Sequence, residues 1–113
     1  MLFTDAGDNA GAAITACGRF QKLCVFDETQ KDWHINTKEF FMTVEALCSA
    51  NLRSLSQRLL CRIDNKVALR WLEAGDVSDS VIRDREIVLA QMARFKEVLP
   101  KFEAIEFAYV PSR

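Results

Sequence analysis

Residues 60–65 read Leu-Cys-Arg-Ile-Asp-Asn, an apolar run that ends in a carboxylate and a polar residue. The N-terminal residues 2–6 read Leu-Phe-Thr-Asp-Ala and repeat this pattern. Short apolar runs that stop at Asp, Asn or Gly are typical of β-strands. The carboxyl ends of neighbouring strands in an open α/β sheet form a natural crevice for a ligand. If these two strands are neighbours, Asp5 and Asp64 therefore meet at one edge of the sheet.

The pattern around these two strands predicts an α/β domain in the order β-β-β-α-β-α-α-β. Strands are expected at residues 2–4, 10–17, 23–26, 59–63 and 104–110, and helices at 36–52, 67–72 and from Ser78 or Ser80 to about Leu99. The first three strands are close enough for an antiparallel meander. The long helix then places the first and fourth strands side by side in parallel. The expected fold is one mixed five-stranded sheet, its first three strands antiparallel, with helices packed on it.

The first helix is expected to be amphipathic, because its apolar residues recur at steps of three and four. These residues are Phe41, Val44, Cys48 and Leu52. Asn36 or Thr37 can cap the helix, which would place Glu39 in its first turn, near the two strand ends. Three converging carboxylates repel one another unless a cation lies between them, and hard oxygen ligands suit Mg²⁺ or Mn²⁺. Taken singly, each acid has a simpler interpretation as a turn former or a partner of the helix dipole.

Length and composition limit the alternatives. With 113 residues the chain has room for one domain, and 15 basic against 16 acidic residues give a net charge of −1. This balance excludes a polycation that binds nucleic acid through bulk charge. The four cysteines lack CxxC spacing and His34 is the only histidine, so no usual zinc pattern is present. We expect reduced, mostly buried thiols in an intracellular protein, cytoplasmic or nuclear, with no signal peptide and no membrane-spanning segment.

Several segments, in this order, resemble the ribonuclease H domains of retroelement reverse transcriptases, in particular those of DIRS-like and related elements. Residues 34–40, His-Ile-Asn-Thr-Lys-Glu-Phe, resemble the start of the helix that carries the catalytic Glu of that family. Residues 62–68, Arg-Ile-Asp-Asn-Lys-Val-Ala, resemble its "TDNxTA" segment. Residues 71–75 and 108–112 resemble the next helix end and the end of the fifth strand. The resemblance spans essentially the whole chain, and its order and spacing are more specific than any one motif.

This resemblance implies an RNase H-like fold and a hydrolase that cleaves the RNA strand of RNA–DNA hybrids with two Mg²⁺ or Mn²⁺ ions. Asp5, Glu39 and Asp64 match the first three acidic ligands of the family. Its fourth carboxylate lies on a helix after strand five, and no such segment follows in this sequence. The expectation is therefore a single RNase H-like domain over residues 1–113, truncated before the last helix and weakly active by itself. The implied partners are the hybrid and an adjacent reverse transcriptase domain of the same polyprotein.

Other residues are weighed as secondary candidates. His34 is expected to be structural, Glu45 to be exposed on the helix, and Trp71 to be buried, while Trp33 could stack on a base. The basic residues of the last helix are interleaved with acids, which favours a solvated mixed-charge face. They are Arg83, Arg85, Arg94, Lys96 and Lys101. Weak binding of the hybrid by the isolated domain is expected, since no concentrated basic segment is visible.

Three alternatives to a ribonuclease H remain open at this point. A non-catalytic RNase H-like module could contact or scaffold nucleic acid. A DDE-type integrase core shares the fold class, but its third acid follows the second Asp, whereas Glu39 lies between Asp5 and Asp64. A small α/β interaction domain would use the acids only as turn formers.

Overall fold

A computed structural model describes residues 1–111 of the chain. The elements are β1 (Leu2–Ala6), β2 (Ala10–Thr15), β3 (Gln21–Val25), α1 (Glu28–Lys31), α2 (Ile35–Leu47), α3 (Ala50–Leu55), β4 (Arg58–Ile63), α4 (Lys66–Ala74), α5 (Arg85–Val98), the 3₁₀ turn η1 (Leu99–Lys101) and β5 (Ala104–Tyr109). Ser112, the last residue of the C-terminal resemblance, lies outside the described residues.

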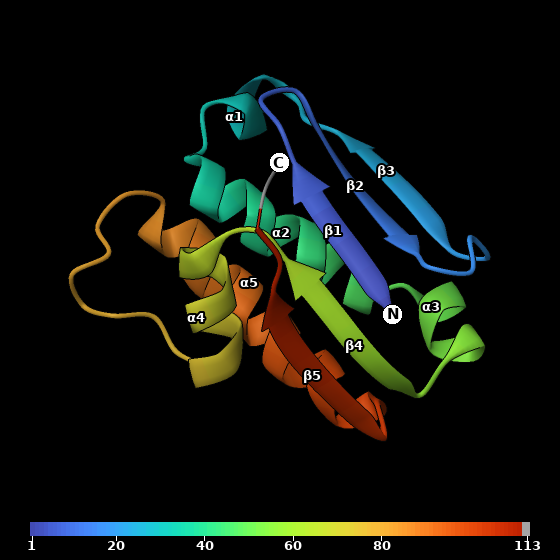
Figure 1. The fold of residues 1–113 in the computed structure, drawn as a ribbon. Coiled ribbons are helices and arrows are strands. Elements are labelled where there is room, and N and C mark those ends of the chain that lie inside the picture. Colours follow the sequence, from blue (N-terminus) through green and yellow to red (C-terminus); the bar gives the residue numbers. More distant parts are fainter. Residues whose placement is uncertain (112–113) are drawn as a thin grey trace.

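The five strands form one mixed sheet in the order β3-β2-β1-β4-β5 (Figure 1). β1 to β3 form the antiparallel meander, and β4 pairs in parallel with both β1 and β5. The register places Thr4 opposite Ile63, so β1 and β4 end side by side. The expected fold class and the parallel pairing of the first and fourth strands are confirmed.

Helices cover one face of this sheet. Along β1, Leu2, Thr4 and Ala6 are buried, while Phe3 and Asp5 alternate with them and are exposed. α2 and α5 lie behind the strands in Figure 1, and α4 packs beside them. α2 touches the sheet, α4 and α5, so ten of its residues are buried. The single apolar stripe expected for this helix is therefore wrong, because α2 is a central helix that neighbours surround.

The first expected helix is two helices. α2 begins one residue before the expected start, because His34 rather than Asn36 or Thr37 is its N-cap, with Nδ1 accepting from the Asn36 N–H. It ends at Leu47, and α3 begins after Ser49. The Arg53 guanidinium donates to the Leu47 carbonyl at 3.0 Å and thus satisfies one of the free carbonyls at the end of α2.

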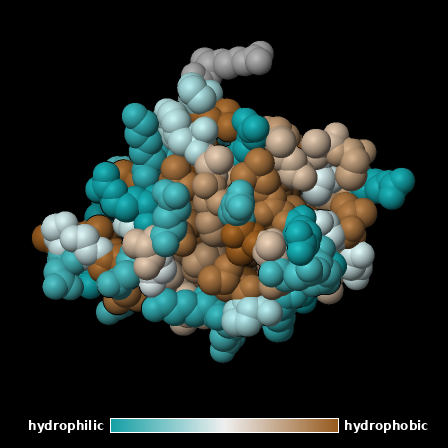
Figure 2. All heavy atoms as spheres, turned by 60° about the horizontal axis from the view of Figure 1, so that its bottom comes forward, coloured by the Kyte–Doolittle hydropathy of each residue, from teal (hydrophilic) through white to brown (hydrophobic). Residues whose placement is uncertain are grey.

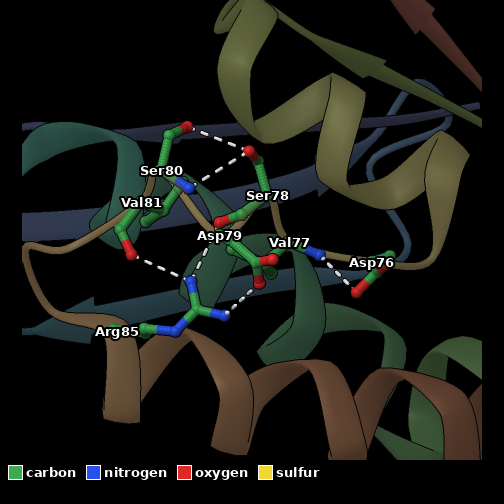
Figure 3. A network of polar contacts seen from close by, with 7 residues as sticks. All are labelled: Asp76, Val77, Ser78, Asp79, Ser80, Val81 and Arg85. Atoms are coloured by element: carbon green, nitrogen blue, oxygen red, sulfur yellow. Dashed lines mark hydrogen bonds and ion pairs between the residues drawn. The ribbon is translucent and has the colours of Figure 1, made fainter.

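The last long helix begins at Arg85 rather than at Ser78 or Ser80. The preceding residues form turns that are held by their own polar contacts (Figure 3). Arg85 Nη1 donates to the carbonyls of Ser78 and Val81 at 2.8 and 2.9 Å, and the Ser78 and Ser80 hydroxyls bond to each other. The serines are therefore used inside a loop, which a capping pattern in the sequence does not distinguish from a helix start.

The opposite face of the sheet carries no helix within residues 1–111 (Figure 1). Four large apolar side chains on its strands are exposed: Phe3, Ile14, Leu23 and Val25. Figure 2 shows the lower side of Figure 1, where apolar residues gather at the centre with hydrophilic residues below and on either side. Among the described helices, none has the length and apolar character that a membrane crossing requires.

All four cysteines are free thiols, but most of them are not buried. Cys61 on the central strand β4 is buried, and burial raises its pKa to about 12. Cys24 and Cys48 are half-buried, and Cys17, in the turn after β2, is exposed. The expectation of mostly buried thiols is wrong, because three of them lie on an edge strand, a helix end and a turn.

Candidate active site

Asp5, Glu39 and Asp64 converge at the edge where β1 and β4 end. Each offers one carboxylate oxygen, and these atoms all lie within 4.8 Å of one another. Asp5 is in β1, Asp64 directly follows β4, and Glu39 extends from α2. The parallel pairing of β1 and β4 brings Asp5 close to Asp64, and the packing of α2 on the sheet brings Glu39 to both of them. The three residues singled out from the sequence are brought together.

Glu39 is the buried member of this cluster, with 3% of its surface exposed. Its Oε1 accepts the Ala6 N–H at 3.0 Å, and its Oε2 is buried with no hydrogen-bond partner. Burial, with the charges of Asp64 and Asp5, raises the pKa of Glu39 to about 8, against the lowering effect of the Ala6 N–H. Glu39 was expected in the first turn of this helix. It lies in the second turn of α2 instead, because the helix begins at Ile35.

The two aspartates are nearer to solvent. Asp5 is exposed and its Oδ1 accepts the Ala6 N–H at 2.9 Å. Asp5 lies within β1, which runs one residue beyond it, and not after the strand as expected. Asp64 is half-buried, and burial followed by the charge of Asp5 raises its pKa. The Ala6 N–H thus contacts two of the three carboxylates.

The cluster fits a divalent metal ion. Its donors are carboxylate oxygens alone, the set that Mg²⁺ and Mn²⁺ prefer. The buried Glu39 Oε2 has an unmet acceptor that a cation would satisfy. Burial first, and then the charges of the neighbouring carboxylates, raise the pKa values of Glu39 and Asp64, and a bound cation would favour the ionised form of both groups.

Three hydrogen bonds hold the start of α2 in place. Asp84 Oδ2 accepts from the His34 N–H at 2.7 Å and from the Thr37 hydroxyl at 3.0 Å. Lys38 is buried, and its Nζ donates to the Asp8 carbonyl at 2.9 Å, in the turn between β1 and β2. Glu39 is therefore flanked by residues that tie α2 to the α4–α5 loop and to the first hairpin.

Gly11 permits the close approach of α2 to the sheet. It pairs with Ala6 across β1 and β2, and a Cβ at this position would lie 2.6 Å from the Met42 Sδ of α2. Met42 is fully buried, so it has little room to move aside.

We expect Gly11→Ala to lower the free energy of unfolding by about 1–3 kcal/mol, the usual cost of an overpacked core. The double variant Gly11→Ala, Met42→Ala should recover part of the loss that Met42→Ala causes alone, because the added methyl enters the space that Met42 leaves. Urea unfolding of the four proteins measures this coupling. Strictly additive losses would show that Gly11 and Met42 do not set the spacing.

The comparisons with known proteins concern the fold. No protein-family model matches the chain, and no curated protein sequence does. Among solved structures, RNase H1 of the halophilic archaeon Halobacterium salinarum is similar with a TM-score of 0.69 at 14% identity, over 97% of this chain and 83% of that one. The N-terminal RNase H domain of a Mycobacterium tuberculosis protein, solved as a fusion with maltose-binding protein, gives 0.60 at 11% identity, over 98% and 87%.

The chain has the ribonuclease H fold.

Within this fold, a pair of asparagines joins the two segments that carry Glu39 and Asp64. Asn65 Nδ2 donates to Asn36 Oδ1 at 2.9 Å, and Asn65 Oδ1 caps α4 by accepting the Ala68 N–H. The contact fixes the start of α2 against the end of β4.

The secondary candidates lie outside the acidic cluster. Trp71 is buried against Phe40, as expected, while Trp33 is half-buried against Phe41, with ring centres 5.3 Å apart. Glu45 is not a freely exposed residue: it pairs with Arg94 at 2.6 Å and with Lys22 at 3.5 Å.

Three of the five basic residues considered earlier have internal partners. Arg94 pairs with Glu45, Arg85 holds the loop before α5, and Arg83 donates to the Asp32 carbonyl. His34 caps α2, which confirms the structural role expected for it.

One residue beside the cluster was missed. Arg62 points to the same face of the sheet as Asp64, two residues before it, and lines the same depression. The signal is present in the sequence, because alternate residues of a strand share a face, but Arg62 was assigned no role of its own within the apolar strand or the segment that resembles "TDNxTA".

Proposed function

We propose that this chain is a ribonuclease H-type endonuclease that hydrolyses the RNA strand of RNA–DNA hybrids. One observation carries the proposal: three carboxylates from β1, α2 and the end of β4 converge within 4.8 Å in a ribonuclease H fold. The two similar structures bear the name RNase H, and the resemblance found in the sequence points the same way.

Asp5, Glu39 and Asp64 are the proposed catalytic residues and metal ligands. These residues would hold divalent ions, two in the complete site, and the ions would supply activation of the attacking water and stabilisation of the charge on the departing 3′-oxygen. Asp5 and Asp64, on the solvent side, face the substrate, whereas buried Glu39 anchors the cluster through the Ala6 N–H. The selectivity for RNA comes from 2′-hydroxyl contacts across the minor groove.

The domain is proposed to act beside a reverse transcriptase domain. Within residues 1–111 the metal-binding cluster has three members, and with three carboxylates a second ion binds weakly, so slow cleavage is expected from the chain by itself. The net charge of −1 supplies little general attraction to a polyanion. An attached polymerase that holds the hybrid would compensate for this.

The test is a cleavage assay with a hybrid whose RNA strand is labelled, in Mg²⁺ and separately in Mn²⁺. Cleavage of the RNA strand in the hybrid is expected, with no cleavage of single-stranded RNA, RNA duplex or DNA duplex of the same sequence. Chelation by EDTA should stop the reaction. Cleavage that persists in EDTA would contradict the proposal.

Hybrid binding and thermal stability, measured beside cleavage, separate two of the alternatives. A non-catalytic module would bind the hybrid without cleaving it, also when fused to a reverse transcriptase domain. An interaction domain without a metal site would show no rise in melting temperature with Mg²⁺ or Mn²⁺, because only a ligand of the folded state stabilises it.

A further inference from the structure

Arg62 lies on the uncovered face of the sheet, in the row next to the acidic cluster. In the register of β4 it stands between Phe3 of β1 and Ala108 of β5. The acids follow one step further along the same face, since Asp5 and Asp64 come two residues after Phe3 and Arg62. A two-residue step along a strand is about 7 Å. Arg62 and the two aspartates thus line one depression of about 400 Å³.

The guanidinium of Arg62 has no acidic partner among the described residues. No ion pair joins it to any carboxylate of residues 1–111, although Asp5 and Asp64 line the same depression. Its Nε is buried and makes no hydrogen bond there. An arginine so placed is unusual, because a buried donor without a partner costs free energy. The other arginine on this face of β4, Arg58, is instead bonded to Glu103 at 2.8 Å.

We propose that Arg62 binds a phosphodiester of the nucleic-acid strand that is cleaved, next to the phosphate held at the acidic cluster. The inference rests on the proposed function and adds to it a residue that positions the substrate. A guanidinium presents a planar fork of donors that matches two phosphate oxygens, and no ion pair within residues 1–111 occupies the two terminal amino groups of Arg62. In the register of the sheet, the exposed ring of Phe3 and the small, half-buried side chain of Ala108 flank Arg62.

The charges around the depression favour a phosphodiester over other ligands. The carboxylates repel an anion, so an anion can lie there only where a cation offsets them, and Arg62 is the one basic side chain that lines the depression in residues 1–111. A phosphodiester strand would meet both requirements, because one phosphate would reach ions held by the carboxylates and its neighbour would reach Arg62.

The test compares wild type with Arg62→Gln and with the matched control Arg58→Gln, on the same face of the same strand. Binding of a hybrid is measured by fluorescence anisotropy in Ca²⁺, after Ca²⁺ has been shown not to support cleavage. Arg62→Gln should weaken binding about tenfold, as expected for one charge-assisted contact, and lower the salt slope by about one. Arg58→Gln should leave both unchanged. Equal binding by the two variants would overturn the proposal.

A substituted substrate tests the same contact without altering the protein. Hybrids with a single uncharged methylphosphonate are prepared at each position of the RNA strand. In wild type, a methylphosphonate at one position near the cleavage site should lower the affinity about tenfold. In Arg62→Gln, the methylphosphonate at this same position should not lower the affinity below that of the unmodified hybrid. Equal losses in both proteins at every position would contradict the assignment.

The outcomes separate this inference from the proposed function. Binding in Ca²⁺ requires no cleavage. A wild-type protein that does not cleave the hybrid, but in which Arg62→Gln cancels the effect of one methylphosphonate, would contradict the proposed activity and support the role of Arg62. Cleavage without this coupling would support the activity and contradict the role of Arg62.

Discussion

Asp5→Asn and Asp64→Asn are each expected to lower the rate of RNA cleavage by about 10²–10³-fold or more. Each substitution removes one of three negative charges that converge within 4.8 Å, so the affinity for the divalent ions falls. The fold should persist, because Asp5 is exposed and Asp64 is half-buried. The Asn side-chain oxygen can also still accept the Ala6 N–H that Asp5 accepts.

The measurement pairs a single-turnover cleavage assay with the rise of melting temperature in Mg²⁺ or Mn²⁺. Asp8→Asn is the matched control, since Asp8 is an exposed aspartate in the turn just beyond β1. It should keep both the activity and the metal-induced rise. Should Asp64→Asn cleave at the wild-type rate, or show an unchanged metal response, the assignment of the site would be wrong.

The sheet could be predicted from the sequence because its strands are short apolar runs bounded by turn residues. The order of the elements then forces β1 and β4 together, since a parallel pair needs a crossover. The convergence of Asp5 with Asp64 follows from that pairing. The place of Glu39 near the start of the helix predicts that it lies close to the two aspartates. Its contact with the Ala6 N–H depends on how α2 packs against β1, which the sequence does not indicate.

The helices were harder to predict, because tertiary contacts decide where they end. Ser78 and Ser80 read as caps, yet Arg85 binds the carbonyls of this segment and holds it as a loop. The stripe in α2 suggested one solvated side, yet neighbours cover nearly all of the helix. Neither the depth of Glu39 nor its unpartnered Oε2 has a signature in the sequence, because burial depends on all the elements around it.

Glu39→Gln is expected to stabilise the metal-free protein at neutral and alkaline pH. In the folded state the pKa of Glu39 is raised from 4.5 to about 8. Between these two values the folded state keeps a proton that the unfolded state has lost, so the free energy of unfolding falls as pH rises through this window. Below about pH 4.5 both states are protonated, and this loss is absent. Glutamine removes the titration and with it this part of the pH dependence.

The size of the effect follows from the shift. A pKa raised from 4.5 to about 8 corresponds to at most about 5 kcal/mol at pH 8 and above. Urea unfolding in EDTA at pH 5, 7 and 9 measures it, as the difference between the variant and wild type. This difference should grow with pH, because only wild type carries the Glu39 carboxyl. Asp64, whose pKa is also raised, is present in both proteins and does not account for the difference. Glu73→Gln, at an exposed position of α4, is the matched control and should follow wild type.

Divalent ions should reverse the trend, and this links the stability of the fold to its proposed chemistry. A cation at the cluster favours the ionised form of Glu39 and gives its buried Oε2 a partner. The rise of melting temperature in Mg²⁺ should therefore grow with pH in wild type, and shrink at every pH in Glu39→Gln, where a charged ligand is missing. If the stability of wild type and of the variant changes with pH in parallel, both in EDTA and in Mg²⁺, then Glu39 neither destabilises the metal-free fold nor binds the metal. If the two profiles diverge as expected, the buried charge of Glu39 destabilises the metal-free fold, and its burial beside two other carboxylates favours the binding of the ions.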